Sequence, residues 1–287
     1  MKARSYILLL LLVLGVVIPH SYSYAAEKAL ILGVFPRHSA KATMHDFQPL
    51  ADYLAKALNR PVILETTADF SSFWKGVSAS RYDIVHFNQY HYLRSHQKSG
   101  YKVIAMNEES GQSTIAGAIV VKKSKGYKPL TELKGSKIIF GGGPKAMMSY
   151  IVPTYLLKKA GLNRNDYIGV FAKTPINALL AVCYGQAAAA GVGDRVLEES
   201  ALQAKCDTSR LTYLAVSEKL AHLPWAVKGS LPKTIQDNIQ FLLVKLKDTA
   251  QGRSILKDIG LTNLIRATDN DYDKHREIVS YVMSEKN

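Results

Sequence analysis

The sequence of residues 137–160 is KIIFGGGPKAMMSYIVPTYLLKKA. It begins with an apolar strand at 137–140, passes through three glycines and a proline, and continues as a predicted helix at about 146–160. A strand that turns tightly into a helix is the βα unit of open α/β sheets, which bind ligands beyond the carboxyl ends of their strands. The stretch therefore predicts both a fold class and the edge of a sheet at which a ligand would bind.

The same alternation of strand and helix continues on both sides of this stretch. We predict strands at 28–35, 62–65, 83–87, 103–107, 114–122, 137–140, 167–171, 187–192, 211–216 and from 223. The predicted helices are at 46–58, 69–77, up to about 98, 146–160, 176–184, 195–203, 232–247 and 272–283. This order predicts an α/β protein with largely parallel sheets.

The chain is predicted to form two lobes. A break at 111–113 precedes the long strand 114–122, and a short strand begins again at 223–225 after the second unit is complete. A chain that crosses between lobes at these two places leaves a hinge of two strands, which suits closure around a ligand. We expect a first lobe of residues 26–113 plus 218–287 and a second lobe of residues 114–217.

The first 25 residues have the pattern of a secretory signal peptide. Lys2 and Arg4 precede an apolar run at 7–18, and small residues that include Ser23 and Ala25 follow. The run is shorter than the roughly 20 residues of a membrane-spanning helix, although an uncleaved anchor remains the alternative. We expect cleavage after Ala25 or one residue later. No cysteine follows that point, so a lipid anchor there is not expected, and the mature protein is predicted to be periplasmic.

The net charge indicates the kind of ligand to expect, and the cysteine content indicates a disulfide. The signal peptide removes two of the 37 basic residues and none of the 23 acidic ones, which leaves a net charge of +12. This charge favours an anionic ligand, and export makes nucleic acid an unexpected partner. Cys183 and Cys206 are predicted to form a disulfide in this compartment, with two buried free thiols as the alternative.

The loop after residue 140 is the first candidate for a binding site. Its glycines let the backbone approach a ligand closely, and the amides at the start of the next helix favour an anion. The spacing is neither G-x-G-x-x-G nor a P-loop, so nucleotide binding is not indicated. The alternative is a tight turn followed by packing residues. The candidate residues here are Gly143, Lys145, Met147, Met148 and Ser149.

Three further candidates follow other predicted strands. Arg37 and His38 follow the first strand, where Arg37 could bind an oxyanion with both guanidinium arms. Asp194 follows the strand at 187–192. The segment 86–92 follows a third strand, with hydrogen-bonding groups and aromatic walls contributed by Asn88, Gln89, Tyr90 and Tyr92. Because all lie at the carboxyl ends of strands, we expect a cleft to gather them.

Enzymatic function is not indicated. The sequence has no G-x-S-x-G and no H-E-x-x-H, and neither cysteine lies in a known nucleophile motif. Copper binding is a sharper alternative, because imidazole and thioether groups suit that metal. Its candidate residues are His38, Met44, His45, His86, His91, Met147 and Met148. We nevertheless predict no metal site and no cofactor.

Several short motifs along the mature chain carry a resemblance to a known family. They are QPLADYL at 48–54, YDI at 82–84, LKG at 133–135, SYIVP at 149–153, GDRVL at 193–197 and HLPWAV at 222–227. With these motifs the chain resembles the phosphate/phosphite/phosphonate-binding (PhnD-like) family of periplasmic solute-binding proteins. The resemblance implies a type II periplasmic-binding-protein fold, a monomer, and delivery of a small anionic ligand to the permease of an ABC importer. A protein that reports to a membrane sensor is the alternative.

The resemblance also shows where this sequence departs from the family pattern. In similar proteins the residues after the glycines are usually Ser-Thr-Ser, whereas Ala146, Met147 and Met148 stand here. Pro175 replaces a histidine, and Arg37 replaces a tyrosine. Tyr92 and Asp194 match positions that the family uses. We therefore expect a phosphate- or phosphonate-like oxyanion to be held by Arg37, Lys145 and backbone amides.

Overall fold

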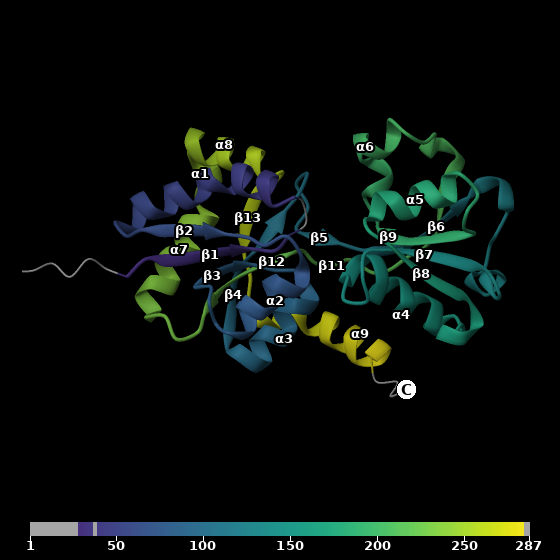
Figure 1. Cartoon of the computed structure of the whole chain (residues 1–287), viewed down its shortest axis with the longest axis horizontal. Coiled ribbons are helices and arrows are strands. Elements are labelled where there is room, and N and C mark those ends of the chain that lie inside the picture. The colour runs from purple at the N-terminus through teal and green to yellow at the C-terminus, as the bar shows by residue number, and fades with distance from the viewer. Residues whose placement is uncertain (1–27, 37–38, 284–287) are drawn as a thin grey trace, which may run out of the picture.

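The computed structural model describes residues 28–36 and 39–283. The expected signal peptide, Arg37 and His38 lie outside the described residues. Within the described part of the chain, no helix is both long enough and apolar enough to cross a membrane. The elements form two halves that lie side by side along the long axis of the molecule, each built around its own sheet (Figure 1).

The first half contains a mixed six-stranded sheet with the order β13-β4-β12-β3-β1-β2. Its strands are β1 Leu30–Val34, β2 Val62–Glu65, β3 Ile84–His86, β4 Tyr101–Glu108, β12 Pro224–Lys228 and β13 Asn263–Arg266. Strand β1 pairs in parallel with β2 and β3, whereas β12 is antiparallel to both of its neighbours. The expectation of a largely parallel sheet is corrected here, because β12 and β13 come from the returning part of the chain.

The second half contains a five-stranded sheet with the order β10-β6-β9-β7-β8. Its strands are β6 Gly117–Lys122, β7 Lys137–Gly141, β8 Ile168–Ala172, β9 Ala189–Gly193 and β10 Leu211–Val216. Strand β7 is parallel to β8 and β9, and β6 is antiparallel to β9 and β10. The parallel strands place the turn after β7 beside the turn after β8, at one edge of the sheet.

Two short strands join the halves. Strand β5, Thr114–Ile115, pairs antiparallel with β11, Leu220–Ala221. The predicted strand at 114–122 is therefore interrupted at Ala116, and the return to the first half begins before the expected position at residue 223. Both strands run between the halves in Figure 1. The predicted hinge of two strands is confirmed.

The helices begin where the sequence supplies caps. The side chains of Ser39, Asp69, Asn88 and Thr174 accept backbone N–H groups at the starts of α1, α2, α3 and α5. The cap at Ser39 starts α1 six residues before the expected position. The helices are α1 Ala40–Leu58, α2 Phe70–Ser78, α3 Gln89–Ser99, α4 Val152–Lys159, α5 Pro175–Cys183, α6 Ser200–Gln203, α7 Lys233–Val244, α8 Ala250–Asp258 and α9 Asp273–Met283.

Each sheet is covered on both faces. In β3, Ile84 packs with the apolar residues of α1, α7 and α8, whereas the next residue, Val85, packs with those of α2 and α3. In β7, Phe140 faces α4 and Ile139 faces α5. This alternation follows from the two-residue period of a strand.

Helix α9 contacts both halves. Ile278 belongs to the apolar cluster around α4, and Val279 packs against that cluster and against the one around α3. The Lys158 ammonium donates to the carbonyl of Tyr281 at 3.0 Å. Residues 218–287 were expected to belong with the first half, and their last helix also reaches the second half (Figure 1).

The predicted disulfide between Cys183 and Cys206 is confirmed. The two Cα atoms are 6.3 Å apart, and the bond links the end of α5 to the segment after α6. It closes a loop with a sequence separation of 23 residues, which stabilises the second half by restricting the unfolded chain.

Candidate functional site

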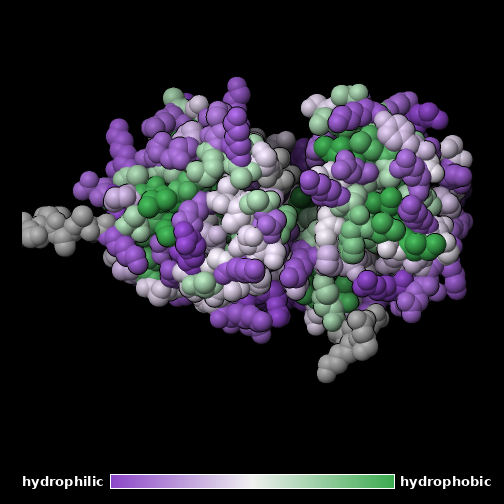
Figure 2. All heavy atoms as spheres, viewed as in Figure 1, coloured by the Kyte–Doolittle hydropathy of each residue, from purple (hydrophilic) through white to green (hydrophobic). Residues whose placement is uncertain are grey.

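A cavity of about 620 Å³ lies between the two halves, where Figure 2 shows the surface hollowed. Its lining comes from the carboxyl ends of β3, β7, β8 and β9 and from the hinge residues Ile115 and His222. Both sheets therefore direct the carboxyl ends of their strands at the same cavity. The volume falls within the usual range for small-molecule sites, about 300–1,000 Å³.

The glycine loop brings two helix starts close together. A Cβ atom on Gly141 would lie 2.4 Å from the Cα atom of Pro175, the first residue of α5. Gly142 has a φ of +116°, and its N–H donates to the carbonyl of Ala172 at 2.9 Å. Only glycine fits both positions without strain. The loop after β7 and the loop after β8 are consequently held side by side at the cavity.

A π-helical turn at Met147–Ile151 precedes α4. The N–H groups of Tyr150 and Ile151 both donate to the carbonyl of Ala146, at 3.0 and 3.1 Å. The N–H groups of Met147, Met148 and Ser149 come before this first hydrogen-bonded turn and point away from the helix, as at any helix start. All three residues line the cavity. The turn therefore offers backbone donors at the cavity.

Four helix starts surround the cavity. The lining includes Phe70 and Ser71 of α2, Asn88 and Gln89 of α3, the π-helical turn before α4, and Thr174 to Ile176 at the start of α5. The N-terminus of a helix carries roughly half a positive elementary charge. Four such ends that face one space create a potential that favours an anion.

Charged side chains increase this positive potential. Lys145 and Lys173 line the cavity beside the glycine loop. Among the described residues of the lining, Glu199 is the one acidic side chain. The balance of charge at the cavity is therefore positive, in agreement with the basic composition of the chain.

Gln89 and His222 are lining residues whose side chains carry polar atoms that the protein encloses. Gln89 is 1% exposed; its Nε2 donates to the carbonyl of Ala221 at 3.4 Å, and its Oε1 has no hydrogen-bond partner within the described structure. His222 is also 1% exposed, and its Nδ1 accepts the N–H of Leu223 at 2.8 Å. The proton of this ring therefore lies on Nε2, which is 3.6 Å from a carboxylate oxygen of Glu109.

The remaining wall of the first half is aromatic. It consists of Phe35, Phe70, Trp74 and His91, which we call the aromatic wall. Burial, together with the positive charge of Lys145, lowers the pKa of His91 from 6.5 to about 4. The imidazole is therefore neutral at physiological pH and contributes an aromatic surface.

The structure brings together most of the residues predicted for the site. Those that line the cavity are Asn88, Gln89, Gly143, Lys145, Met147, Met148 and Ser149. Tyr90 and Tyr92 do not line it. The Tyr92 hydroxyl donates to Asp269 Oδ1 at 2.5 Å, and its ring packs against Tyr272 at 5.1 Å between centroids. Burial raises the pKa of Tyr92 well above its ordinary value.

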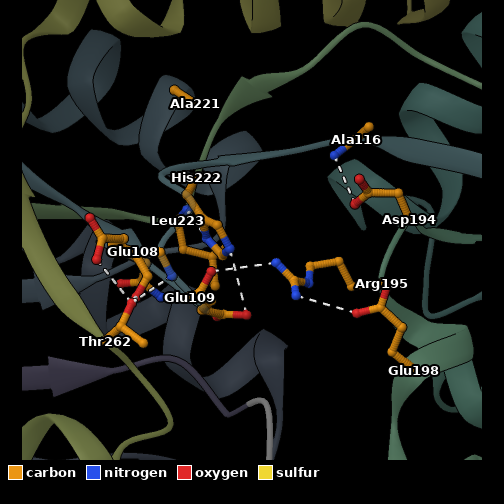
Figure 3. Close-up of polar contacts among 12 residues, drawn as sticks. Glu108, Glu109, Ala116, Asp194, Arg195, Glu198, Ala221, His222, Leu223 and Thr262 are labelled. Carbon is orange, nitrogen blue, oxygen red and sulfur yellow. Dashed lines mark hydrogen bonds and ion pairs between the residues drawn. The ribbon is translucent and has the colours of Figure 1, made fainter.

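Asp194 lies at the hinge and outside the cavity lining (Figure 3). Its Oδ1 accepts the N–H of Ala116 at 3.0 Å, its backbone N–H donates to the carbonyl of Ala116 at 2.9 Å, and its carboxylate pairs with Lys219. The next residue, Arg195, donates to the carbonyl of Glu109 in the first half at 3.5 Å and pairs with Glu198 at 3.3 Å. These contacts fasten the second half to the hinge strands.

The sequence analysis missed several lining residues. They are Phe70, Ser71, Trp74, Ile115, Lys173, Thr174, Ile176, Val196, Glu199 and Leu223. His91 and His222 were noted only as a copper candidate and as part of a family motif. Lys173 and Thr174 could have been predicted from the sequence, because they follow the predicted strand at 167–171 as the glycine loop follows the strand at 137–140.

A smaller cavity is also present within the described residues. A second cavity of about 180 Å³ lies within the first half, where it is lined by residues that include Phe47, His86 and Glu109. His86 stacks on Trp225 with 4.4 Å between the ring centroids. Within the described residues, no group of three or more His, Cys, Asp or Glu side chains could hold a metal ion.

Two α/β lobes, a two-strand hinge and a cavity between their strand ends define a type II periplasmic binding protein. Residues 32–272 match the sequence family described as ABC transporter, phosphonate, periplasmic substrate-binding protein. The chain belongs to this family. Its members are solute-binding components of transport systems in the periplasm.

Solved structures agree in fold. The chain is similar to PhnD1 from Prochlorococcus marinus in complex with methylphosphonate, with 17% identity, a TM-score of 0.75, and coverage of 90% of this chain and 99% of that one. A binding-protein component of a Pseudomonas aeruginosa ABC phosphonate transporter has 14% identity, a TM-score of 0.73 and coverage of 89% and 86%. A Xanthomonas citri protein bound to ATP has 13% identity, a TM-score of 0.77 and coverage of 89% and 97%.

Proposed function

We propose that this chain captures a phosphate- or phosphonate-like oxyanion between its lobes and delivers it to an ABC importer, without catalysing a reaction. The lobes are residues 26–113 plus 218–287 and residues 114–217, joined at β5 and β11. The signal peptide is removed near Ala25, and the monomer acts in the periplasm. The observation that carries the proposal is the set of four helix starts and two lysines around one cavity.

The second half supplies most of the anion contacts. Backbone N–H groups of Met147 to Ser149 supply the donors that the hydroxyls of a Ser-Thr-Ser sequence at 146–148 would supply, and the Ser149 side chain is buried beside them. Lys145 and Lys173 supply positive charge. Because hydrogen bonds to a charged group contribute about 1.5–3 kcal/mol each, a few such contacts suffice for specific binding.

The first half completes the site when the lobes close. Gln89 and His222 lie on its side of the cavity, and the starts of α2 and α3 face the same space. A ligand that touches both lobes binds the closed form better than the open form, and this difference drives closure. A closed, ligand-bound form is the species that a membrane permease would recognise.

Calorimetric titration of the mature protein with phosphate, phosphite, methylphosphonate, sulfate and an alkylsulfonate tests the proposal. At least one of these anions should bind, and the double variant Lys145→Gln/Lys173→Gln should weaken that binding at least tenfold, because two charged contacts are lost. The control variant is Lys247→Gln, since Lys247 is exposed on the 3-10 turn after α7 and is not part of the lining. Unchanged affinity in the double variant, or the absence of binding by every anion tested, contradicts the proposal.

A further inference from the structure

Helix α2 presents two separate apolar faces. Phe73 and Val77 are 2% and 0% exposed and belong to the core of the first half, where Phe73 stacks on Tyr82 at 5.0 Å. Phe70 and Trp74 are also four residues apart, and both line the cavity. Residues at this spacing share one side of a helix, so the second face is directed at the ligand space.

On this second face, Trp74 also packs against the core of the first half, whereas Phe70 does not belong to that core. Phe70 is 44% exposed although it is a large apolar side chain, whereas the buried core beneath it is closed by Phe73. Exposed apolar groups that gather at one place mark a binding surface more often than a structural feature. Phe70 and Trp74 therefore point to a ligand group that covers them.

The aromatic wall is continuous. The ring centroids of Phe35 and Phe70 are 6.0 Å apart, those of Phe70 and His91 are 5.9 Å apart with nearly parallel planes, and those of Trp74 and His91 are 5.0 Å apart. These separations are the ones at which aromatic rings attract one another. The rings hold each other in place and form a preformed surface along one side of the cavity.

The opposite side of the cavity is also apolar beyond the anion site. Met147 and Met148 lie at the π-helical turn, and Ile115, Ile176 and Val196 extend the same lining. Thioether side chains adapt their shape to aromatic groups and contact them favourably. The lining thus combines helix starts and lysines at the glycine loop with apolar side chains from both halves.

We propose that the natural ligand is an amphipathic anion, in which an oxyanion head binds at the glycine loop and a flat aromatic body lies against Phe70 and Trp74. This inference rests on the proposed function, because it uses the same anion site. A bare oxyanion contacts only one end of the cavity. A cationic group on the aromatic wall is disfavoured, because Lys145 lies close enough to affect His91 electrostatically.

Methylphosphonate and phenylphosphonate test the inference, because they share one head group and differ in the body. We expect phenylphosphonate to bind at least tenfold more tightly in calorimetric titration. Phe70→Ala should reduce this ratio of affinities to less than threefold. The matched control is Phe241→Ala, because Phe241 is 58% exposed on α7 and takes no part in the cavity lining; it should leave the ratio unchanged.

Tryptophan fluorescence tests the contact between the ligand and Trp74. The chain contains two tryptophans, and Trp225 is wholly buried with its Nε1 donating to Asn107 Oδ1 at 2.8 Å. A change in emission upon addition of phenylphosphonate should therefore come from Trp74, and Trp74→Phe should abolish the change while an aromatic ring is kept. Methylphosphonate should alter the emission less than phenylphosphonate does.

The outcomes separate the two proposals. If the two phosphonates bind equally, or if the preference for phenylphosphonate survives in Phe70→Ala, the aromatic contact is refuted and the anion site remains. If neither phosphonate binds and none of the inorganic anions does, the proposed function itself fails. Binding of choline, a quaternary ammonium without an acidic group, would show that the cavity takes a cationic ligand and would overturn the inference.

Discussion

Gly142 and Gly143 are neighbours in the glycine loop, but their backbone conformations and surroundings differ. Gly142 has a φ of +116°, which side-chain-bearing residues rarely adopt, and a Cβ on it would lie 3.1 Å from the Cβ of Ala146. No heavy atom lies within 4 Å of a Cβ placed on Gly143. The loop therefore needs glycine at one position, and at the other it leaves space through which a ligand reaches the backbone.

This contrast gives a prediction for two alanine variants. Gly142→Ala should lower the free energy of unfolding by about 1–3 kcal/mol, because it forces a strained backbone, and should weaken anion binding. Gly143→Ala should change the stability by less than about 0.5 kcal/mol, as surface substitutions usually do. Urea unfolding followed by circular dichroism measures both values. Equal destabilisation by the two variants would show that the strain does not lie at Gly142.

Single residues also show the limits of prediction from sequence. Asn88 and Lys145 were expected at the site because they follow strands directly, and both line the cavity. Asp194 and Tyr92 satisfy the same rule, yet one faces the hinge and the other faces Asp269. Position relative to a strand indicates which edge a residue occupies, but the direction of its side chain depends on neighbours that are distant in sequence.

At the scale of elements, the strands and helices with strong local signals were predicted well. Strand β2 and helix α2 lie where the apolar pattern and the Asp69 cap indicated. Strand β13 was missed, because Asn263–Arg266 is short and is defined only by pairing with β4 across the sheet. The predicted helix at 195–203 is divided into a 3-10 turn and α6, and Arg195 at its start donates to the carbonyl of Glu109 in the first half.

The hinge elements give a second prediction. Asp194→Ala should lower the free energy of unfolding by about 1–3 kcal/mol, because it leaves the buried N–H of Ala116 without its acceptor. Asp194→Asn keeps an acceptor oxygen and should cost less. Lys219→Ala should cost at most about 1 kcal/mol, because the Lys219 side chain is 50% exposed.

Urea unfolding of the three hinge variants distinguishes the two roles of Asp194. A loss in Lys219→Ala as large as that in Asp194→Ala would mean that the ion pair, rather than the hydrogen bond to the backbone, holds the hinge. Ligand affinity should change in these variants only through the balance of open and closed forms, because Asp194 lies outside the cavity lining.

At the scale of the whole molecule, two features act on the ligand before it reaches the cavity. The net charge of the chain, +14, attracts anions to the surface in general, and the four helix starts concentrate this attraction at the cavity. Helix α9 packs against α4 while its chain belongs to the returning segment. Closure must therefore either carry α9 along or shift it against one lobe.

Buried histidines couple the stability of both halves to pH. Burial lowers the pKa of His275, on α9, from 6.5 to about 4, and burial together with Lys145 does the same for His91. The unfolded chain takes up these protons near pH 6.5, whereas the folded chain takes them up only near pH 4. The folded state therefore binds fewer protons in this window, and the free energy of unfolding must fall as the pH falls through it.

The size of this effect can be predicted for each ring. Between pH 7 and pH 5 a histidine with this shift should contribute a loss of about 2 kcal/mol. His275→Gln and His91→Gln should each reduce the pH dependence by that amount, whatever they do to stability at pH 7. The control is His45→Gln, because the His45 side chain is 87% exposed and should leave the dependence as it is. Urea unfolding at pH 7, 6 and 5 measures the slopes. If neither buried variant flattens the curve, the two rings take up protons without unfolding, and the packing of α9 and of the aromatic wall is looser than the structure shows.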